Sequence, residues 1–524
     1  MKQHWKWVVL TAASLGWVLD FLFWKQGLGV NFAIYAVACL GGGLLVMQRT
    51  RQRIAASEVW LAPLILIFAV STFVRAEPLT LFLSVLLTLL LMAMLAATYL
   101  GGGWLRFDLL DHAAAFWRLV RSMLVRPLGF LGEIRSQEAR QGGKSARTGP
   151  WPVVRGILIA LPILIVFAAL LGSADAVFGS ELQAFLQVFQ LQRLPEFVFR
   201  LAFMAVAAYA LIGVYLHAGS GSTNGDLATD RKPRIPQFLG FVEAGIVLGS
   251  VAALFSAFVV IQFQYFFGGQ ANISVRGYTY AEYARRGFGE LLAVAFFSLL
   301  MIMAFGTVSR RETRMQQSLF SALSVMIVAL VSVMLVSAFQ RLSLYEMAYG
   351  FSRLRAYVHV SLIWIGLLLA AVVVLQLLHR ERLFAAAALI SVLGFALSLS
   401  VLNVDGFIVR QNVNRAVRGE GLDVPYLVSL STDSVPVLQA IFESPSYPGL
   451  TRDAVGAVLG CRQHVHALRL DVDWRSFTIS ASWAGNAMGA LRTQLAAYRL
   501  AEAEGPLRLI TPGSVLYECG GYPD

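Results

Sequence analysis

Three short segments hold most of the residues in this chain whose types and spacing could do chemistry. They are YTYAEYARRGFGELL at 278–292, QRLSLYEMAYGFSRLRAYV at 340–358 and NVDGFIVRQNVNR at 403–415. Arginine forks and phenol hydroxyls recognise phosphate and carboxylate groups, and a nearby carboxylate can give or take a proton. The segments therefore predict a site for an anionic group, an acid–base pair, or a set of internal ion pairs.

The first segment has the spacing of a self-neutralising column. If its second half is helical, Glu282, Arg286 and Glu290 recur every four residues and pair along one face. Tyr283 and Arg285 add a phenol and a second cation beside that column. Glu290 also lies within about one turn of the apolar run that follows, where an unpaired charge is costly.

The second segment carries a regular stripe. On one continuous helix, the residues at every fourth position face the same neighbour. Those residues are Arg341, Tyr345, Tyr349, Arg353 and Tyr357. Gly350 can break the helix midway, which would divide the stripe into two short faces.

The third segment adds Asp405, Arg410 and Asn412, and we expect all three segments to meet at one end of the molecule. The complete candidate ligand-binding set is Glu282, Tyr283, Arg285, Arg286, Glu290, Arg341, Tyr345, Tyr349, Arg353, Asp405, Arg410 and Asn412. The alternative is structural: the arginines pair with lipid phosphates or with carboxylates, and so tie the tail of the chain to its helices. The available carboxylates are Glu282, Glu290, Glu346 and Asp405.

The elements that must position these residues are membrane-spanning helices. Hydrophobic residues make up 58% of the 524 residues and charged residues 14%, and the mean hydropathy is +0.68, which exceeds what one soluble domain can bury. Apolar runs of about 20 residues are long enough to cross a bilayer as helices. Eleven such runs lie near 7–24, 27–47, 59–74, 79–100, 153–172, 196–217, 240–266, 289–308, 318–338, 357–378 and 384–403. The predicted fold class is all-α, a polytopic transmembrane helical bundle.

The distribution of Lys and Arg predicts the orientation of these spans. Alternate loops, starting with the N-terminus, hold 22 of these residues, whereas the opposite short loops hold nine. Because cytoplasmic loops carry the excess of positive charge, we expect a cytoplasmic N-terminus and an extracytoplasmic tail after Val404.

The chain divides into four parts by composition. We expect an N-terminal four-span bundle at 1–100, a cytoplasmic interfacial helix with a flexible linker at 101–150, a seven-span core bundle at 151–403 and a small helical extracytoplasmic domain at 404–524. The interfacial helix starts near Trp104, where the sequence is amphipathic, and the linker starts at Gly132, where apolar residues become few.

Three further polar residues have two interpretations each. Cys461 and Cys519 both fall in the tail, on the oxidising side, and either form a disulfide or remain thiols. Asp20 lies inside the first span, and it either pairs with Lys25 or a backbone donor, or takes part in a proton or cation relay. Cys461 also lies near His464 and His466, but that spacing lacks a fourth ligand, so we expect no metal.

Other function classes find no support in the sequence. It contains no P-loop, G-x-S-x-G, H-E-x-x-H or CxxC pair, so no cofactor is expected and enzymatic activity is not indicated. Residues 1–403 hold 32 basic and 18 acidic groups and residues 404–524 hold 10 and 12, so the net charge of +12 comes from the first part of the chain. This excess reflects membrane orientation and gives no sign of nucleic-acid binding. The expected partners are membrane lipids and an anionic small molecule or lipid headgroup.

The three polar segments also resemble those of a known family. Together with the tail to residue 438, they are similar to the hallmark segments of a bacterial group of multi-pass inner-membrane proteins described only as a domain of unknown function, over roughly residues 160–440. In the tail the similarity rests on Asn403, Asp405, Ile408, Asn412, Asp423, Tyr426, Leu427, Leu430, Ser431, Asp433 and Pro436. The resemblance implies a bacterial cytoplasmic membrane and no particular activity.

Three hypotheses about function follow. The first is a transporter or envelope-homeostasis protein that binds an anionic solute or lipid headgroup through outer arginines such as Arg341 and Arg353. The second is a membrane-embedded transferase that acts on a lipid-linked donor, with Asp405, Glu282 or Glu290 as acid or base. The third is a sensor or scaffold without small-molecule chemistry.

Overall fold

A computed structural model describes most of the chain. The described residues are 4–141, scattered positions between 156 and 180, 194–222, 237–266, 288–378, 380, 383–465, 473–501 and 507–520. Within these ranges ten helices are long and apolar enough to cross a membrane. They match ten of the eleven expected spans, and the expected span near 153–172 lies largely outside the described residues. The predicted fold class, an all-α bundle of spanning helices, is confirmed.

The N-terminal group of helices packs around α8. Its members are α1 (Trp5–Phe23), α2 (Val30–Arg49), α3 (Leu61–Val74), α4 (Pro78–Thr98) and α8 (Leu194–Ser220). The short helix η2 (Ala56–Glu58) precedes α3. The division by composition placed α8 with the later spans, but it packs along α1. Gly16 makes this possible, because a Cβ there would lie 2.6 Å from the carbonyl oxygen of Met204.

An amphipathic helix crosses the base of this group. After η3 (Trp104–Arg106), α5 (Leu109–Gln141) packs against α8 and α4. Arg126 of α5 donates to the carbonyl oxygen of Leu216 at 3.0 Å. The helix continues past Gly132 to Gln141, into the first part of the segment expected as a linker.

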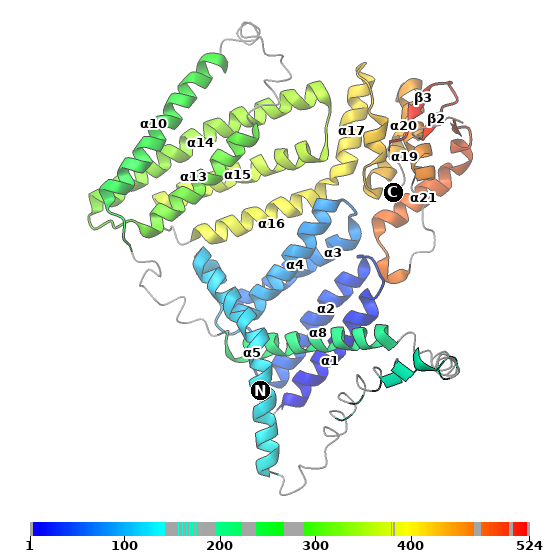
Figure 1. The fold of residues 1–524 in the computed structure, drawn as a ribbon. Helices are drawn as coiled ribbons and strands as arrows, with labels where there is room; N and C mark the ends of the chain where they lie inside the picture. Colours follow the sequence, from blue (N-terminus) through cyan, green and yellow to red (C-terminus); the bar gives the residue numbers. More distant parts are fainter. Residues whose placement is uncertain are drawn as a thin grey trace.

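The C-terminal group of helices has its own apolar core. Its members are α10 (Phe241–Phe266), α13 (Phe288–Val308), α14 (Arg314–Tyr349), α15 (Arg353–Leu377) and α16 (Phe384–Leu402). Buried residues from α10, α13, α14 and α15 form one cluster. Helix α16 lies between the two groups, and it contacts α15 on one side and α4 on the other (Figure 1).

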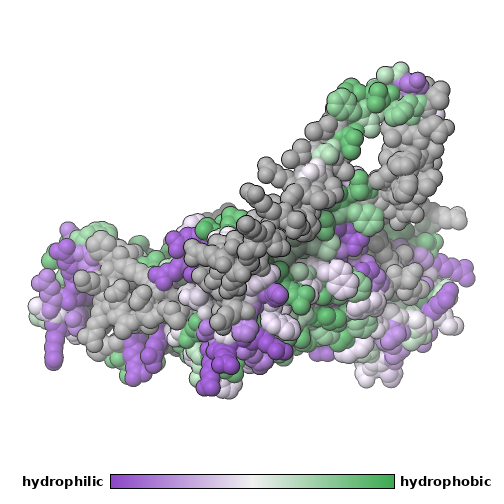
Figure 2. Space-filling model, turned by 90° about the horizontal axis from the view of Figure 1, so that it is seen from below, coloured by the Kyte–Doolittle hydropathy of each residue, from purple (hydrophilic) through white to green (hydrophobic). Residues whose placement is uncertain are grey.

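Apolar side chains cover much of the outside of both groups. Phe82 of α4, Phe296 of α13 and Val401 of α16 are more than half exposed. Figure 2 shows hydrophobic residues reaching the surface between separate hydrophilic patches. This surface is typical of helices surrounded by lipid.

A small domain follows the last span. Its helices are α17 (Val404–Val417), α18 (Val424–Val428), η7 (Thr432–Ser434), α19 (Val435–Glu443), α20 (Gly449–Val465), η8 (Trp474–Ser476) and α21 (Ile479–Leu495). A three-stranded antiparallel sheet completes it, with β1 (Arg499–Leu500), β2 (Arg508–Ile510) and β3 (Leu516–Glu518) in the order β1-β2-β3. The sheet is a small addition to the helical domain that the sequence predicts.

The chain leaves the helical path before the sheet because Tyr498 packs into the small domain. In the sequence, a helical spacing of apolar residues continues to about residue 504, but α21 ends at Leu495. Tyr498 turns inward and packs over Gly456, where a Cβ would lie 2.1 Å from the tyrosine hydroxyl. In β2 the burial alternates, with Leu509 buried between its neighbours, as a period of two requires.

Two cysteines of the small domain are joined by a covalent bond. Cys461 of α20 and Cys519, just after β3, form a disulfide. It fastens the sheet to the central helix of the domain. Cys39 is a buried thiol within the core of the N-terminal group.

The loops that connect the spanning helices lie at two opposite ends of the helix groups. The α1–α2 loop, the α3–α4 loop and the α14–α15 turn all bond to the small domain, through Val30, Ala76 and Phe351. At the opposite end, the N–H of Gly101 donates to Ser222 and Leu239 forms a bridge with Ser309. This grouping agrees with the alternation that the spans predict.

Candidate functional site

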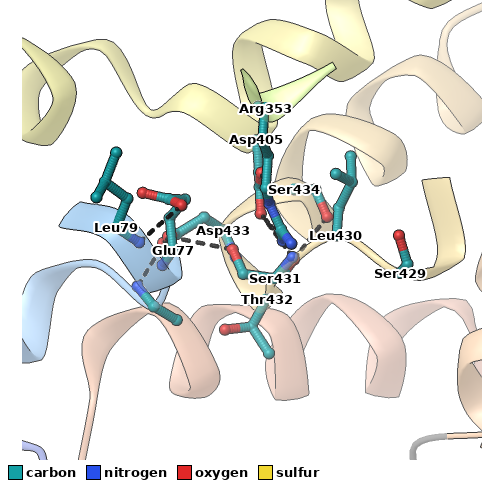
Figure 3. A network of polar contacts seen from close by, with 12 residues as sticks. Glu77, Leu79, Arg353, Asp405, Ser429, Leu430, Ser431, Thr432, Asp433 and Ser434 are labelled. Carbon is teal, nitrogen blue, oxygen red and sulfur yellow. Dashed lines mark hydrogen bonds and ion pairs between the residues drawn. The ribbon is translucent and has the colours of Figure 1, made fainter. Parts of the chain in front are cut away.

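The ion pair between Arg353 and Asp405 is the centre of the polar residues at this end. Arg353 is the first residue of α15 and Asp405 the second of α17. The guanidinium donates twice, from Nε to Oδ1 at 2.8 Å and from the terminal nitrogen to Oδ2 at 2.7 Å. Asp405 is fully buried, and the N–H of Ser431 donates to its Oδ2 at 2.6 Å (Figure 3).

These contacts determine the protonation state of Asp405. Burial alone would raise the pKa of its carboxyl group, but the guanidinium of Arg353 and the N–H of Ser431 lower the pKa by more, so it lies below its usual value. Asp405 is therefore a carboxylate at neutral pH, with both oxygens occupied. This environment does not suit the acid or base role that the sequence suggested for it.

The turn between α14 and α15 is held against α17. Gly350 has φ +76° and ψ 177°, a conformation that residues with a Cβ rarely adopt. The next residue, Phe351, bonds to Asn412 twice: its N–H donates to Oδ1 at 2.8 Å, and its carbonyl accepts from Nδ2 at 2.9 Å. The N–H of Arg353 donates to the hydroxyl of Tyr426 at 2.8 Å.

The α3–α4 loop joins the same arrangement through Asp433. The Oδ2 of Asp433 accepts from the N–H groups of Ala76 at 2.8 Å and Glu77 at 3.0 Å. Glu77 caps α4 by accepting from the N–H of Leu79 and Thr80, and the hydroxyl of Tyr357 donates to its carboxylate. We call Glu77, Arg353, Asp405, Asn412, Tyr426, Ser431 and Asp433 the junction network.

Arg462 supports the junction network from inside the small domain. Its guanidinium is buried, and it donates to the carbonyl oxygens of Val428, Leu430 and Ser431 and to the hydroxyl of Ser434 at 2.8 Å. Burial lowers the pKa of Arg462 to about 10, so it remains charged at neutral pH. Its bonds fix the loop that presents Ser431 to Asp405.

A third contact joins the small domain to the α1–α2 loop. The N–H of Val30 donates to the carbonyl oxygen of Phe477 at 2.9 Å, and Arg475 donates to the carbonyl oxygen of Phe21 at 2.7 Å. Asp473 accepts from Arg475, which lowers the pKa of Asp473 to about 2. The domain is thus bonded to loops of both helix groups.

The predicted stripe in the second segment is divided between two helices. Helix α14 ends at Tyr349 and α15 begins at Arg353, so the break at Gly350 occurs and the continuous stripe does not form. Tyr345 and Tyr349 lie against each other, with ring centroids 5.0 Å apart.

Neighbouring charges of the second segment have internal contacts. The guanidinium of Arg355 lies 4.1 Å from the ring centroid of Tyr345 and donates to the carbonyl oxygen of Tyr349. Glu346 is buried and pairs with His359 at 3.1 Å. Arg341 is half-buried and also has an interaction partner.

Two further candidates within the described residues lie away from the junction network. Arg410 lies on α17 but points to the surface. Glu290 is exposed in the first turn of α13. Glu282, Tyr283, Arg285 and Arg286 lie outside the described residues, so the proposed column through Glu290 is not described either.

Asp20 has a different partner from the one expected. It pairs with Arg200 of α8, whose Nε lies 3.0 Å from both carboxylate oxygens. Lys25 pairs instead with Glu196 at 2.9 Å. The prediction of an Asp20–Lys25 pair is wrong, because it used closeness in sequence and α8 packs directly against α1.

Sequence reasoning missed several residues of this arrangement as site residues. Glu77 carried a usable signal, since a carboxylate followed by Pro78 and an apolar run is typical of a helix start. Tyr426, Ser431 and Asp433 entered only through the family resemblance. Arg462 had no signal, because it resembles any arginine near the end of an amphipathic helix.

The arrangement gives no sign of metal chemistry in the described residues. No group of three or more His, Cys, Asp or Glu side chains that could hold an ion occurs among them. Cys461 is engaged in the disulfide, and His466 lies outside the described ranges.

The junction network can do little chemistry, because its side chains already bond to one another or to the backbone. Of the predicted candidates, the structure brings together Arg353, Asp405 and Asn412, and each bonds to another part of the protein. Such a bonded set holds elements in place, whereas an anion site needs donors that are free to turn toward the ligand.

Fold and junction together define a multi-pass α-helical membrane protein with a small domain fastened to one end of its spans. The chain belongs to the family described as "Domain of unknown function (DUF4153)", whose model matches residues 62–441. The matched range begins in α3 and ends in α19, so it includes every residue of the junction network. Comparisons with curated proteins and with solved structures found no match.

Proposed function

We propose that this is an envelope-homeostasis protein of the bacterial inner membrane that acts as a non-catalytic sensor or scaffold. Its N-terminus is cytoplasmic, and the domain after Val404 is extracytoplasmic. The excess of Lys and Arg in the loops at the opposite end supports this orientation. The disulfide between Cys461 and Cys519 supports it as well, because such bonds persist in oxidising compartments.

The observation that carries the proposal is the closed Arg353–Asp405 pair. Both charges are satisfied within the protein, and the carboxylate is inaccessible to solvent. A transporter or transferase that used this pair would need to open it at a cost of several kcal/mol. A scaffold needs the pair only to hold its exported domain at a fixed place on the membrane core.

A double variant tests whether the pair acts by charge or by position. Arg353→Met with Asp405→Asn removes both charges and keeps an acceptor for the N–H of Ser431. Replacing a buried ion pair with matched neutral groups is often tolerated. We therefore expect the domain to stay docked, as measured by protease resistance, and the variant to complement a deletion strain under envelope stress.

A docked but inactive double variant would contradict the scaffold proposal and favour ligand or proton chemistry at the pair. The single variant Arg353→Ala is the matched control for undocking, because it leaves the buried carboxylate unpaired. For the orientation, an alkaline phosphatase fused after Asp524 should be active; activity only of a cytoplasmic reporter would contradict it.

A second candidate function is binding of an anionic lipid headgroup or solute on the surface of α17. Arg410, Asn414 and Arg418 are four residues apart and all exposed, so they form one polar face of α17. Arg410→Ala with Arg418→Ala should keep the domain docked but weaken binding to vesicles containing phosphatidylglycerol. Unchanged vesicle binding would remove this candidate.

A further inference from the structure

Exposed aromatic side chains occupy the segment of the small domain that meets the α1–α2 loop. Trp474 of η8 and Trp483 of α21 are 55% and 58% exposed, and Phe477 between them in the chain is also exposed. A surface that faces water rarely carries several large aromatic rings in one short segment. We call these three residues the aromatic edge, and their exposure indicates a partner other than water.

The segment around the aromatic edge is nearly free of charge. From residue 476 to residue 491 the sequence contains no Asp, Glu, Lys, Arg or His. Arg475, just before this range, is paired with Asp473. The exposed residues of α21 in this range include Ala481 and Ala490. Since about a quarter of the residues of soluble proteins are charged, mostly on the surface, the first turns of α21 suit a less polar environment than water.

The contacts of Phe477 place the aromatic edge at the end of a span. Its carbonyl oxygen accepts from the N–H of Val30, the first residue of α2. The two backbones are in close contact, because a Cβ at Gly29 would lie 2.6 Å from the carbonyl carbon of Ser476. Helix α2 has 20 residues, or about 30 Å, which is the thickness of the hydrocarbon core of a bilayer. Phe477 therefore lies near the boundary between hydrocarbon and headgroups.

The aromatic edge continues the exposed surface of a spanning helix. The ring centroid of Trp474 lies 6.4 Å from that of Phe21, and Phe21 stacks on Trp17 at 5.7 Å. Phe21 and Trp17 belong to α1, a helix long and apolar enough to cross a membrane, and both side chains are exposed. A bilayer that surrounds α1 covers these two rings and extends from them to Trp474.

Two other exposed apolar side chains of the small domain have different surroundings. Leu450 is 75% exposed at the start of α20, but Arg452 lies in the same turn of the helix. Leu516 of β3 is 50% exposed, and Glu518 of the same strand pairs with Arg508 at 3.0 Å. Charged groups beside these leucines suit a surface in water. The aromatic edge thus differs from them in its position and in its uncharged surroundings.

We propose that η8 and the first turns of α21 form a membrane-contacting surface, which inserts the aromatic edge into the headgroup and ester region of the leaflet nearest the small domain. The partner is the lipid bilayer itself. Aromatic side chains are favoured at this depth, because the ring is apolar and the indole N–H can bond to water or to a lipid oxygen. The proposal rests on the spanning helices. It does not depend on the scaffold function or on which way the chain is oriented.

Photo-cross-linking of the full-length protein in lipid nanodiscs tests this contact. Benzoylphenylalanine replaces Trp474 or Trp483, and it replaces Leu450 or Leu516 as exposed controls, in discs of phosphatidylethanolamine and phosphatidylglycerol. After irradiation and digestion, the labelled peptides are analysed by mass spectrometry. We expect each aromatic position to give at least about tenfold more phospholipid adduct than the controls, because an inserted side chain stays in contact with lipid.

A phospholipid yield at either aromatic position that is no higher than at the controls would overturn the proposal. Cross-links from Trp483 to another segment of the chain or to a second copy, in place of lipid, would also overturn it, because protein would then cover this surface. Thermal unfolding checks that each labelled protein is folded.

Tryptophan fluorescence gives a second readout without an unnatural side chain. Nanodiscs made from phospholipids brominated near the ester groups quench the tryptophans that contact lipid at that depth. Trp483→Phe should therefore lose part of the quenched intensity of wild type. Trp104→Phe is the control and should keep that intensity, because Trp104 is 5% exposed. An unchanged quenched intensity in Trp483→Phe would contradict the proposed contact.

Discussion

Two arginine–aspartate pairs of this protein have nearly the same local geometry and different surroundings. Arg353 and Arg200 each grip both oxygens of a buried carboxylate, Asp405 and Asp20 respectively. Asp405 also bonds to Ser431, within a network that joins three parts of the chain. Among the described residues, the carboxylate of Asp20 bonds only to Arg200, and that arginine lies against the ring of Trp24.

Because their surroundings differ, the two ion pairs have different structural roles. The Arg200–Asp20 pair fixes the register of two adjacent helices, and Arg200 remains 30% exposed, so it can turn toward the membrane surface. The Arg353–Asp405 pair lies where a span, a turn and the small domain meet. Losing it should release a whole domain, whereas losing the other should loosen one helix contact.

The largest effect should come from Arg353→Ala. It leaves the fully buried Asp405 without its counter-ion, which costs about 3–5 kcal/mol of docking free energy. Limited proteolysis of the small domain should then be faster by about 10²-fold to 10⁴-fold, because cleavage follows the open population. A change of less than threefold in a folded variant would show that the pair does not hold the domain.

Gly350→Ala should have the next largest effect. Alanine disfavours φ +76° with ψ 177°, and its Cβ would lie 2.6 Å from Oδ1 of Asn412. We expect a loss of about 1–3 kcal/mol in docking, measured by the same proteolysis. Gly366→Ala in α15 is the control, since a Cβ there meets only Leu335 at an ordinary 3.5 Å. Equal behaviour of the two variants would contradict the role of the turn.

Arg200→Ala should have a smaller effect, about 1–2 kcal/mol in thermal stability of the membrane core, with no release of the small domain. Asp20 lies near the end of α1, so water and headgroups can partly replace the lost arginine. Lys25→Ala is the control and should change little, since Lys25 is 70% exposed and bonds to Glu196 instead. A larger effect from Lys25 than from Arg200 would restore the pairing that the sequence suggested.

Between pH 5 and 8 the docking contributed by Asp405 should not change. Its folded-state pKa is lowered below the usual 3.8, so the stabilisation is complete above that value and is lost as the pH falls through the folded-state pKa. Proteolysis of the domain with pH-matched proteases should therefore accelerate only in strongly acidic buffer. A transition near pH 6 would mean that another group controls docking.

The spans were predictable because each is a long apolar run. Such a run can be recognised without knowing what it packs against. The small sheet was not, since β1 and β2 are two and three residues long. Tyr498, which lies between the end of α21 and β1, is fixed by contact with a distant glycine. Short strands depend on what they pack against, and the sequence does not state that.

The candidate site was predictable in part for the same reason. Asp405 and Asn412 are seven residues apart on α17 and share a face, whereas Arg410, five residues after Asp405, falls about 140° away and faces outward. Once α17 is known to be a helix, its period assigns Asp405 and Asn412 to one face and Arg410 to another. It cannot identify a partner 180 positions away, which is the separation of Arg200 from Asp20.

The bond from Glu77 to Asp433 spans 356 positions, and this separation imposes an order on biosynthesis. The ribosome must pass Arg462 before the loop that receives Glu77 can be supported, and the bridge at Cys519 closes later still. During that interval the nascent membrane helices must persist without the contacts that the small domain later makes with their loops. A protease that recognises unpaired loops could therefore distinguish an incomplete chain from a finished one.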